Sequence, residues 1–490
     1  MTNLLLVTAD QWRGDSLGCA GHPAVATPTV DRLAAEGVRF SRHFGQATPC
    51  GPARASLFTG LYALNHRSIT NGTPLDGRHT HLARELRALG RAPAVFGYTD
   101  TSPDPRGLAP ADPRLATFEG FASEWDVVQP LLEDGEPWLA WLDAQGYGRL
   151  GLADVYGGAL GEPAPFSAAH SEAAFLTERF LGWLERREPG WCAHLAFVKP
   201  HPPLVAPAPY HAAVHPDDVP APVGLAGAEG AALHPYLRVL AAQPRSAGWW
   251  GKPASDDPDT VRRARAVYYG LIAQVDAALG RIVAALEARG ELDDTLVVVT
   301  SDHGEMLGDH GLWGKAGFFP QAFHVPLVVR GPGAVRGRVV DAVTEHVDLL
   351  PTLLEALGGT APLQADGYSL APWLAGEEPA AWRRAALVEH DFRDLGNPVF
   401  ERALGLAPEH CQLAALLGEA FVYVHFNGLP PLAFDRAQDA EMIRDIAGER
   451  VRAPEVLEAA QAMLTRRMDA ADRRLTGAKL TAGGVVGRFA

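Results

Sequence analysis

Cysteine is scarce in this 490-residue chain, and its four positions form no paired pattern. Cys19, Cys50, Cys192 and Cys411 are widely spaced, and no two of them make a C-x-x-C pair. This spacing indicates neither a disulfide framework nor a structural zinc site. For three of the four, burial as a reduced thiol is the simplest expectation, because free cysteine usually packs as a small hydrophobic side chain.

Positive charge is also in deficit, with 43 Lys and Arg residues against 58 Asp and Glu residues and a formal net charge of -15. No run of Lys or Arg interrupts this acidic balance, so we expect no nucleic-acid-binding surface. An anionic substrate would need a local pocket of positive charge.

Long apolar runs are missing as well. No segment approaches the roughly 20 apolar residues of a membrane-spanning helix, so we expect no membrane insertion. The apolar start at residues 3–8 is too short, and too soon followed by Asp10, for the apolar region of a signal peptide. We therefore expect a cytoplasmic protein.

The residues that are present follow the alternating pattern of an α/β fold. Hydrophobic residues make up 47% of the chain, which is enough for a large core, and the length suggests one large domain and one small domain. Short apolar runs alternate with helical patterns, which is typical of a parallel sheet covered by helices. Strands are expected at residues 4–8, 94–97, 192–198, 296–301 and 326–330, and helices at residues 30–36, 261–289 and 347–357.

The pattern changes near the C-terminus. Residues 419–427 alternate like an antiparallel strand of a smaller sheet, residues 454–471 resemble a closing helix, and the segment after Arg474 resembles an exposed arm. We therefore expect a large α/β domain, which would hold any catalytic site, over residues 1–388. A smaller α+β subdomain with a terminal arm would occupy residues 389–490.

Two pairs of polar residues follow predicted strands at matching ends. Asp10 and Gln11 come directly after the first strand, and Asp302 and His303 follow the strand at residues 296–301. Open α/β sheets bind their ligands at this carboxyl edge. Two carboxylates, an amide oxygen and an imidazole suit Ca²⁺, Mg²⁺ or Mn²⁺, with the nitrogen favouring Mn²⁺. One pair alone would more often cap the following helix, but two pairs at matching strand ends favour a metal site.

A cysteine at a helix start is the third notable feature. Cys50 begins the segment C-G-P-A-R-A-S-L-F-T-G, in which residues 48–51 are turn-forming and residues 53–58 resemble the first turns of a helix. A helix N-terminus offers unpaired N–H groups to a tetrahedral oxyanion such as phosphate or sulfate, and Arg54 would add a permanent positive charge. Taken alone, a cysteine here would more often be a buried packing residue.

Several of these segments together resemble the formylglycine sulfatase family of the alkaline phosphatase superfamily. The C-x-P-x-R sequence at Cys50 fits the signal at which that family oxidises a cysteine to Cα-formylglycine, and the Asp302-His303 pair is the second specific motif. Supporting motifs follow in the order that the family shows, namely Asp10-Gln11 and residues 27–34, 301–305 and 347–352. The resemblance implies an α/β fold of the alkaline-phosphatase type, a three-layer sandwich with a large, mainly parallel sheet and a smaller C-terminal antiparallel sheet with a helix.

The same resemblance implies one divalent metal ion, Mn²⁺ or Ca²⁺. Its ligands would be Asp10, Gln11, Asp302, His303 and the formylglycine oxygen that replaces the sulfur of Cys50. Conversion of Cys50 would need a formylglycine-generating enzyme as a partner during maturation. Zinc is less favoured, because neither a second histidine nor a thiolate accompanies the set.

Cationic side chains complete the catalytic set that the resemblance implies. Besides Cys50, this set contains Arg54, His201 and Lys315. His201 lies in a Pro-rich segment and Lys315 in a Gly-rich segment, where a lone histidine or lysine is usually a surface residue. The family pattern, and not the spacing, therefore supports both. Lys199, His310 and Arg67 are weaker candidates.

The chemistry of the family depends on the two hydroxyls of a hydrated aldehyde. One hydroxyl would attack phosphorus or sulfur, and deprotonation of the other would later expel the bound oxyanion by breaking the C–O bond. Asp302 would orient the nucleophile or accept its proton, while Arg54 and Lys315 would balance charge on the transferring group. His201 or Lys315 would protonate the leaving alkoxide. Such a site would accept several kinds of tetrahedral ester.

A departure from the common sulfatase pattern points to one branch of the family. Sulfatases commonly carry a Gly-Lys-Trp-His segment after a Gly-Tyr strand end, whereas this chain reads G-Y-T-D-T-S-P-D-P from Gly97. Here, and at residues 71–76 and 426–432, the chain resembles the phosphonate monoester hydrolase and phosphodiesterase branch. That resemblance implies that Asn71 and Tyr98 line the substrate pocket. Asp100 stands where the branch has a neutral hydroxyl residue, and an acid beside an anionic substrate is unfavourable unless it meets a metal, a cation or the leaving group.

Three functional hypotheses follow. The first is a hydrolase of phosphonate monoesters and phosphodiesters, small anionic esters, with side activity on sulfate esters. The second is an arylsulfatase, and the third is a non-catalytic metal-binding protein in which Cys50 stays a thiol. The resemblance also implies a homodimer or homotetramer, with the C-terminal arm and the Pro-rich and Gly-rich loops at residues 202–222 and 226–251 as contacts.

Overall fold

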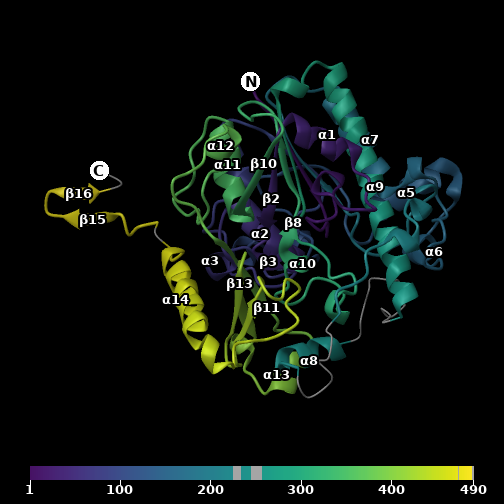
Figure 1. The fold of residues 1–490 in the computed structure, drawn as a ribbon. Coiled ribbons are helices and arrows are strands. Elements are labelled where there is room, and N and C mark those ends of the chain that lie inside the picture. Colours follow the sequence, from purple (N-terminus) through teal and green to yellow (C-terminus); the bar gives the residue numbers. More distant parts are fainter. Residues whose placement is uncertain (225–232, 244–256, 473, 488–490) are drawn as a thin grey trace.

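The computed structural model describes residues 1–224, 233–243, 257–472 and 474–487, shown in Figure 1. Its centre is a nine-stranded sheet made of β1 (Asn3–Ala9), β2 (Val38–Phe44), β4 (Pro93–Gly97), β5 (Asp126–Pro130), β6 (Cys192–Phe197), β7 (Thr295–Thr300), β8 (His324–Val325), β9 (Leu327–Arg330) and β10 (Arg338–Glu345). The strand order is β10-β2-β9-β7-β1-β6-β4-β5, and β8 pairs with β2.

The large sheet is mainly parallel, as predicted. β1 pairs in parallel with both β6 and β7, and β4 pairs in parallel with β5 and β6. Two strands are exceptions: β9 runs antiparallel to both β2 and β7, and the two-residue β8 runs antiparallel to β2. All seven residues of β1 are buried, which fits a central strand covered on both faces.

Helices cover both faces of the large sheet and make three layers. Successive residues of β1 point to opposite faces, so that Leu5 and Val7 lie in one apolar cluster and Leu4 and Leu6 in another. The first cluster contains residues of α1 (Pro28–Glu36), α7 (Glu172–Leu184) and α9 (Pro258–Ala288). The second contains residues of α2 (Cys50–Thr59), α4 (Leu82–Ala88), α11 (Leu349–Ala356) and α12 (Ala371–Leu374).

The longest helix, α9, is apolar enough to cross a membrane when only length and composition are considered. However, 67% of its most apolar window is buried inside the protein, where it packs against the large sheet. Its start is fixed locally, because the Asp257 side chain accepts a hydrogen bond from the Thr260 N–H at 2.9 Å and Pro258 occupies the first turn. Packing in the core accounts for the apolar character of this helix.

A five-stranded second sheet adjoins the large one. It contains β3 (Ala47–Thr48), β11 (Ala385–Asp391), β12 (Gln412–Gly418), β13 (Phe421–Phe426) and β14 (Leu432–Asp435), in the order β14-β13-β12-β11-β3. Its last four strands in the chain are antiparallel, as expected, and Met463 of α14 (Ala453–Asp469) packs with Leu416 and Tyr423 of this sheet. β3 comes from the N-terminal part of the chain and lies two residues before Cys50, so the second sheet reaches the neighbourhood of that cysteine.

The C-terminal segment forms a short hairpin of β15 (Ala478–Thr481) and β16 (Gly484–Gly487). It follows α14 and extends away from the rest of the protein, as Figure 1 shows at the yellow end of the chain. Almost all of its residues are exposed. The remaining helices are α3 (Ala63–His66), α5 (Glu136–Leu142), α6 (Leu152–Tyr156), α8 (Pro235–Ala242), α10 (Pro320–Phe323) and α13 (Val399–Leu404).

One expected loop is partly helical. Residues 226–251 were expected to form a surface loop, and much of that stretch lies outside the described residues. Within it, however, α8 forms, because Pro235 occupies the first turn and the His234 ring accepts a hydrogen bond from the Tyr236 N–H at 3.3 Å. Tyr236 is fully buried, so tertiary packing also stabilises this helix.

Candidate active site

The site lies at the carboxyl edge of the large sheet. Asp10 follows β1, Tyr98 follows β4, His201 follows β6 and Asp302 follows β7, and these four strands are neighbours in the sheet. Cys50 is the first residue of α2 and is buried. The fold therefore gathers side chains from five distant parts of the sequence at one place, as the strand-end argument predicted.

Four of the predicted metal ligands form one compact group. The ligand atoms of Asp10, Cys50, Asp302 and His303 all lie within 4.8 Å of one another, and all four residues are buried. His303 Nε2 lies 3.3 Å from the Cys50 sulfur and 3.8 Å from a carboxylate oxygen of each aspartate. Asp10 Oδ1 accepts no hydrogen bond from the described residues although it is buried. This unsatisfied oxygen, among carboxylate and imidazole donors, fits a hard divalent cation.

Gln11 lies beside this group in a left-handed backbone conformation with φ of 68°. Its backbone N–H donates to Asp302 Oδ1 at 3.1 Å. Its side-chain amide donates to Glu305, and its amide oxygen accepts from Lys315 Nζ at 3.0 Å. Glu305 thus fixes the orientation of the amide, so that the oxygen and not the nitrogen faces Lys315. A positive φ in a non-glycine residue is uncommon and is held here by these contacts.

Arg54 ties the two aspartates together. The side chain is fully buried and donates to Asp302 Oδ2 at 2.9 Å, to Asp10 Oδ2 at 3.2 Å and to the Tyr98 carbonyl at 3.2 Å. Its guanidinium also lies 4.1 Å from the centre of the Tyr98 ring, and the Tyr98 hydroxyl donates to Asp10. Burial would raise the pKa of Asp10, but His201, Lys315 and the neighbouring cations outweigh it and hold that pKa below its usual value.

Lys315 places a positive charge against Cys50. Its Nζ donates to the Cys50 sulfur at 3.0 Å. Burial alone would lower the pKa of Lys315, but Cys50 and Asp10 raise it above its ordinary value, so the amine stays charged. Burial, together with Asp10, raises the pKa of the Cys50 thiol. An unmodified Cys50 would therefore remain a neutral thiol at physiological pH, which is a weak nucleophile.

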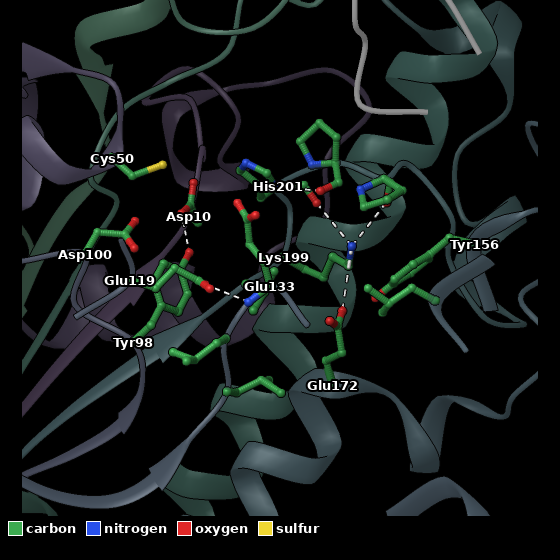
Figure 2. Close-up of a pocket in the computed structure, with 16 residues that line it drawn as sticks. Asp10, Cys50, Tyr98, Asp100, Glu119, Glu133, Tyr156, Glu172, Lys199 and His201 are labelled. Atoms are coloured by element: carbon green, nitrogen blue, oxygen red, sulfur yellow. Dashed lines mark hydrogen bonds and ion pairs between the residues drawn. The ribbon is translucent and has the colours of Figure 1, made fainter. Parts of the chain in front are cut away.

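A cavity of about 350 Å³ opens beside this group, as Figure 2 shows. It is lined by Asp10, Cys50, Tyr98, Asp100, Glu119, Leu131, Leu132, Glu133, Leu152, Tyr156, Glu172, Val198, Lys199, His201, Pro202 and Pro203. Of the candidates proposed from the sequence, Cys50, Tyr98, Asp100 and His201 therefore face the same space as Asp10. The volume suits a small organic ester.

His201 and Lys199 bring nitrogen groups to the cavity wall. His201 Nδ1 lies 2.5 Å from the Pro202 carbonyl oxygen, and burial together with Lys315 lowers the pKa of His201 to about 4. Its imidazole is therefore neutral near pH 7, and its one N–H lies on Nδ1 and donates to the Pro202 carbonyl. Lys199 Nζ donates to two backbone carbonyls, lies 3.6 Å from a Glu172 carboxylate oxygen and sits over the Tyr156 ring.

Asp100 and Asn71 differ in how they approach the site. Asp100 has φ of 49°, is only 4% exposed and lines the cavity, and its Oδ1 accepts no hydrogen bond from the described residues. Burial raises the pKa of Asp100 to about 7. Asn71 instead accepts a hydrogen bond from the Gly51 N–H at 2.8 Å, so it supports the start of α2. It is not among the residues that line the cavity.

Two carboxyl groups on the cavity wall were not predicted from the sequence. Glu119 lies in an irregular segment, and Glu133 follows β5, an edge strand that the sequence pattern did not indicate. The Glu133 N–H donates to Glu119 Oε1 at 2.6 Å, so the two segments are joined. The two adjacent valines at residues 127 and 128 were the one local signal for the strand that precedes Glu133. Burial raises the pKa of Glu119 to about 8, and partial desolvation at the cavity rim raises the pKa of Glu133.

The weaker cationic candidates divide between the cavity and other places. Lys199 lines the cavity, whereas Arg67 is half exposed and lies 3.9 Å from Asp391. His310 stacks on Phe319 with ring centres 3.9 Å apart. Neither Arg67 nor His310 is among the residues that line the cavity.

Comparisons with known proteins agree with this geometry. Residues 2–359 match the Sulfatase family, and residues 308–414 match the C-terminal part of N-sulphoglucosamine sulphohydrolase. The multifunctional alkaline phosphatase superfamily protein PehA of Trinickia caryophylli is 38% identical over 97% of this chain and 96% of its own length. An arylsulfatase of Clostridium perfringens is 26% identical over 81% of this chain and 82% of its own.

Two solved structures are similar along the whole chain. The phosphonate monoester hydrolase of Agrobacterium radiobacter is 42% identical, with a TM-score of 0.95 and 100% coverage of both chains. The phosphonate monoester hydrolase of Silicibacter pomeroyi is 38% identical, with a TM-score of 0.92 and coverage of 100% of this chain and 99% of its own.

Proposed function

The chain belongs to the sulfatase family, and on that basis we propose that it hydrolyses phosphonate monoesters and phosphodiesters and accepts sulfate esters as poorer substrates. Membership also confirms the alkaline-phosphatase-like three-layer fold expected from the sequence. The observation that carries the substrate class is the likeness, from end to end, to two phosphonate monoester hydrolases.

The donor set at the site fits the metal ion that the family uses. Asp10, Gln11, Asp302 and His303 would hold one divalent ion, and Asp10 Oδ1 is a buried carboxylate oxygen without a hydrogen-bond partner among the described residues. We favour Mn²⁺ or Ca²⁺, because the ligands are mostly oxygens. When bound, the ion would supply positive charge next to residue 50.

Residue 50 would act after conversion to formylglycine, in which an aldehyde hydrate takes the place of the Cys50 thiol. This modification would supply an oxygen nucleophile, which the neutral, buried Cys50 thiol does not offer. A formylglycine-generating enzyme is therefore part of the proposal, since the C-G-P-A-R segment at Cys50 carries the recognition signal.

The other residues would each do a separate task. Arg54 fixes Asp10 and Asp302 through direct hydrogen bonds and keeps both carboxylates aimed at residue 50. Lys315 donates at the position of the Cys50 sulfur and would stabilise negative charge on the reacting oxygens. His201 lines the cavity, and because its neutral ring already donates the Nδ1–H to the Pro202 carbonyl, it would protonate the leaving oxygen only after taking up a proton at Nε2.

An arylsulfatase is the second candidate. The match to the Sulfatase family and the likeness to an arylsulfatase favour it. Against it, the segment after Tyr98 lacks the lysine and histidine with which sulfatases commonly hold the sulfate group.

We also propose a cytoplasmic homo-oligomer. The four cysteines are all free, which suits a reducing compartment. The C-terminal arm exposes apolar side chains, with Leu475 before the hairpin at 76%, and Leu480 and Val486 within it at 81% and 57% exposure. Burial of these side chains against another copy would remove apolar surface from water.

Initial rates on three esters of 4-nitrophenol test the function. We expect the phenylphosphonate monoester and the ethyl phosphodiester to give higher kcat/KM than the sulfate, with Cys50→Ala as the control for contaminating activity. Mass spectrometry of the peptide that contains Cys50 should show the formylglycine. Dominant turnover of the sulfate would instead establish an arylsulfatase, and full activity with an unmodified thiol would refute the formylglycine chemistry.

A further inference from the structure

Five carboxyl groups line the cavity, and among the described residues only two of them lie within ion-pair distance of a cation. Asp10 lies 3.2 Å from Arg54 Nη2, and Glu172 lies 3.6 Å from Lys199 Nζ. The other three, Asp100, Glu119 and Glu133, form no ion pair within the described part of the chain. We call these three residues the acidic wall. They lie beside a site that must bind an anionic ester, which makes their negative charge costly unless something compensates it.

Asp100 is the member of the acidic wall that is buried with a carboxylate oxygen unpartnered in the described part of the chain. Its side chain is buried, yet Oδ1 accepts no hydrogen bond from the described residues and the carboxyl lines the cavity. Figure 2 shows it between Cys50 and Tyr98, with its oxygens directed toward the space in front of them. A buried polar atom of this kind normally has a partner, so the open side of Asp100 points to a ligand.

The two cations near Asp100, Arg54 and Lys315, donate their hydrogen bonds to other groups. Arg54 donates to Asp10, Asp302 and the Tyr98 carbonyl. Lys315 donates to Gln11 and to residue 50. Neither forms a hydrogen bond with Asp100, although the charge of each favours its ionised form. The described part of the chain therefore offers Asp100 no hydrogen-bonded cation, and a ligand can supply one from the open cavity.

A second metal ion does not fit the acidic wall. The group of acidic and histidine side chains that converges to metal-binding distance among the described residues is Asp10, Cys50, Asp302 and His303. Asp100, Glu119 and Glu133 do not converge in that way, and Glu133 lies on the exposed rim of the cavity. Carboxyl groups spread along a wall suit an organic cation, which is larger than a metal ion and donates several hydrogen bonds.

We propose that the acidic wall binds an ammonium group carried by the organic part of the ester, so that the preferred substrates are zwitterions. The oxyanion end would lie at residue 50, near Arg54 and Lys315, and the ammonium end would lie against the acidic wall. Leu131, Leu132 and Leu152 line the same cavity and would contact the carbon chain between the two charges. This inference rests on the proposed function, since it names the class of ester that the same site would prefer.

Matched diesters test the proposal directly. Each diester carries a 4-nitrophenyl leaving group and a second group. The second group is either an ω-aminoalkyl chain, with two to five carbons before the amine, or an n-alkyl chain of the same length. A charge-assisted hydrogen bond predicts that kcat/KM for the amino ester exceeds that for the alkyl ester by about tenfold or more at the best length. Equal or better turnover of the alkyl ester at every length would overturn the proposal. Absence of turnover for all diesters, with the phosphonate monoester also inert, would instead contradict the proposed function.

Isosteric variants locate the effect. Asp100→Asn, Glu119→Gln and Glu133→Gln should each lower the ratio of the two kcat/KM values, because each removes a carboxyl group that can ionise and pair with the ammonium group. Glu188→Gln is the matched control, since Glu188 is exposed and precedes β6 at the opposite edge of the sheet. Glu133 is itself exposed, so Glu133→Gln should fold even if a buried substitution does not. A ratio that stays the same in the folded wall variants, or that falls equally in Glu188→Gln, would refute binding at the acidic wall.

Discussion

The ammonium nitrogen of Lys315 lies 3.0 Å from the sulfur of Cys50, although 265 positions separate the two residues in the sequence. The same nitrogen donates to the Gln11 amide oxygen at 3.0 Å, and the Gln11 amide is oriented by Glu305. A permanent positive charge is thus held against the atom at which the nucleophile would form. Because the charge is fixed before substrate arrives, little reorganisation is needed during reaction.

Replacement of Lys315 by methionine should lower kcat/KM for the phosphonate monoester by roughly a hundredfold or more, because a fixed cation at the reacting oxygens is lost. Lys315→Arg keeps the charge but changes its geometry, so we expect partial activity. Both variants need mass spectrometry of residue 50, since loss of conversion would mimic loss of catalysis. Unchanged kcat/KM in Lys315→Met with full conversion would exclude Lys315 from the catalytic group.

Removal of the metal should affect stability as well as rate. A chelator should abolish hydrolysis and lower Tm, because an ion that binds only the folded protein stabilises it by mass action. Elemental analysis should find about one equivalent of metal in the wild type and much less in Asp302→Asn. The surface substitution Asp134→Asn serves as the control. Full activity after verified removal of the metal would show that Asp10 and Asp302 serve another purpose.

The strands that position the site were predictable because of where they lie in the sheet. β1, β4, β6, β7 and β9 are buried, and buried strands carry continuous apolar runs that mark them in a sequence. β2, β5 and β10 were missed, since they contain charged or exposed residues that interrupt the apolar pattern. α2 was expected from residue 53 but begins at Cys50, because the start of a helix depends on local backbone geometry more than on composition.

The candidate metal-binding group could be predicted from the strand ends, whereas the acidic wall could not. Asp10 and Asp302 follow strands with strong sequence patterns, so their convergence follows from the topology of a parallel sheet. Glu119 lies in an irregular segment, and its place in the cavity depends on its contact with the backbone of Glu133. Asn71 was expected in the pocket but contacts the Gly51 N–H instead, a short-range detail that no periodic pattern encodes.

Deletion of residues 474–490 should reduce the size of the assembly. The exposed apolar side chains of Leu475, Leu480 and Val486 make the C-terminal arm suitable for a contact between copies. Light scattering after size exclusion should report a smaller mass for the deletion and for the double variant Leu480→Ser, Val486→Ser. Leu395 is 92% exposed outside the hairpin, so Leu395→Ser controls for the loss of an exposed leucine. An unchanged mass in both arm variants would mean that the arm does not join the copies.

Acid should destabilise the protein below about pH 6.5 through its buried histidines. His66 accepts a hydrogen bond from the Ser68 N–H at 3.0 Å, and its Nε2 lies 3.0 Å from the Ser56 hydroxyl of α2. Burial, with His79 and Arg67 nearby, lowers the pKa of His66 from 6.5 to about 3. Between about pH 6.5 and pH 3, the unfolded chain therefore binds a proton at His66 that the folded protein does not bind. The free energy of unfolding keeps its full value above pH 6.5 and decreases as the pH falls.

At pH 5 this single histidine should cost about 2 kcal/mol of folding free energy, since each pH unit below 6.5 costs about 1.4 kcal/mol. His66→Gln cannot take up the proton, so Tm of this variant should fall less between pH 7.5 and pH 5 than Tm of the wild type. The comparison uses the pH-dependent change, because loss of the two histidine hydrogen bonds lowers Tm at both pH values alike. His410→Gln, at an exposed position, should leave the pH-dependent change as it is in the wild type. An equal fall in Tm in His66→Gln and the wild type would mean that His66 does not cause the acid sensitivity. The cause would then lie at another buried histidine, such as His194, because burial also lowers the pKa of His194 to about 3.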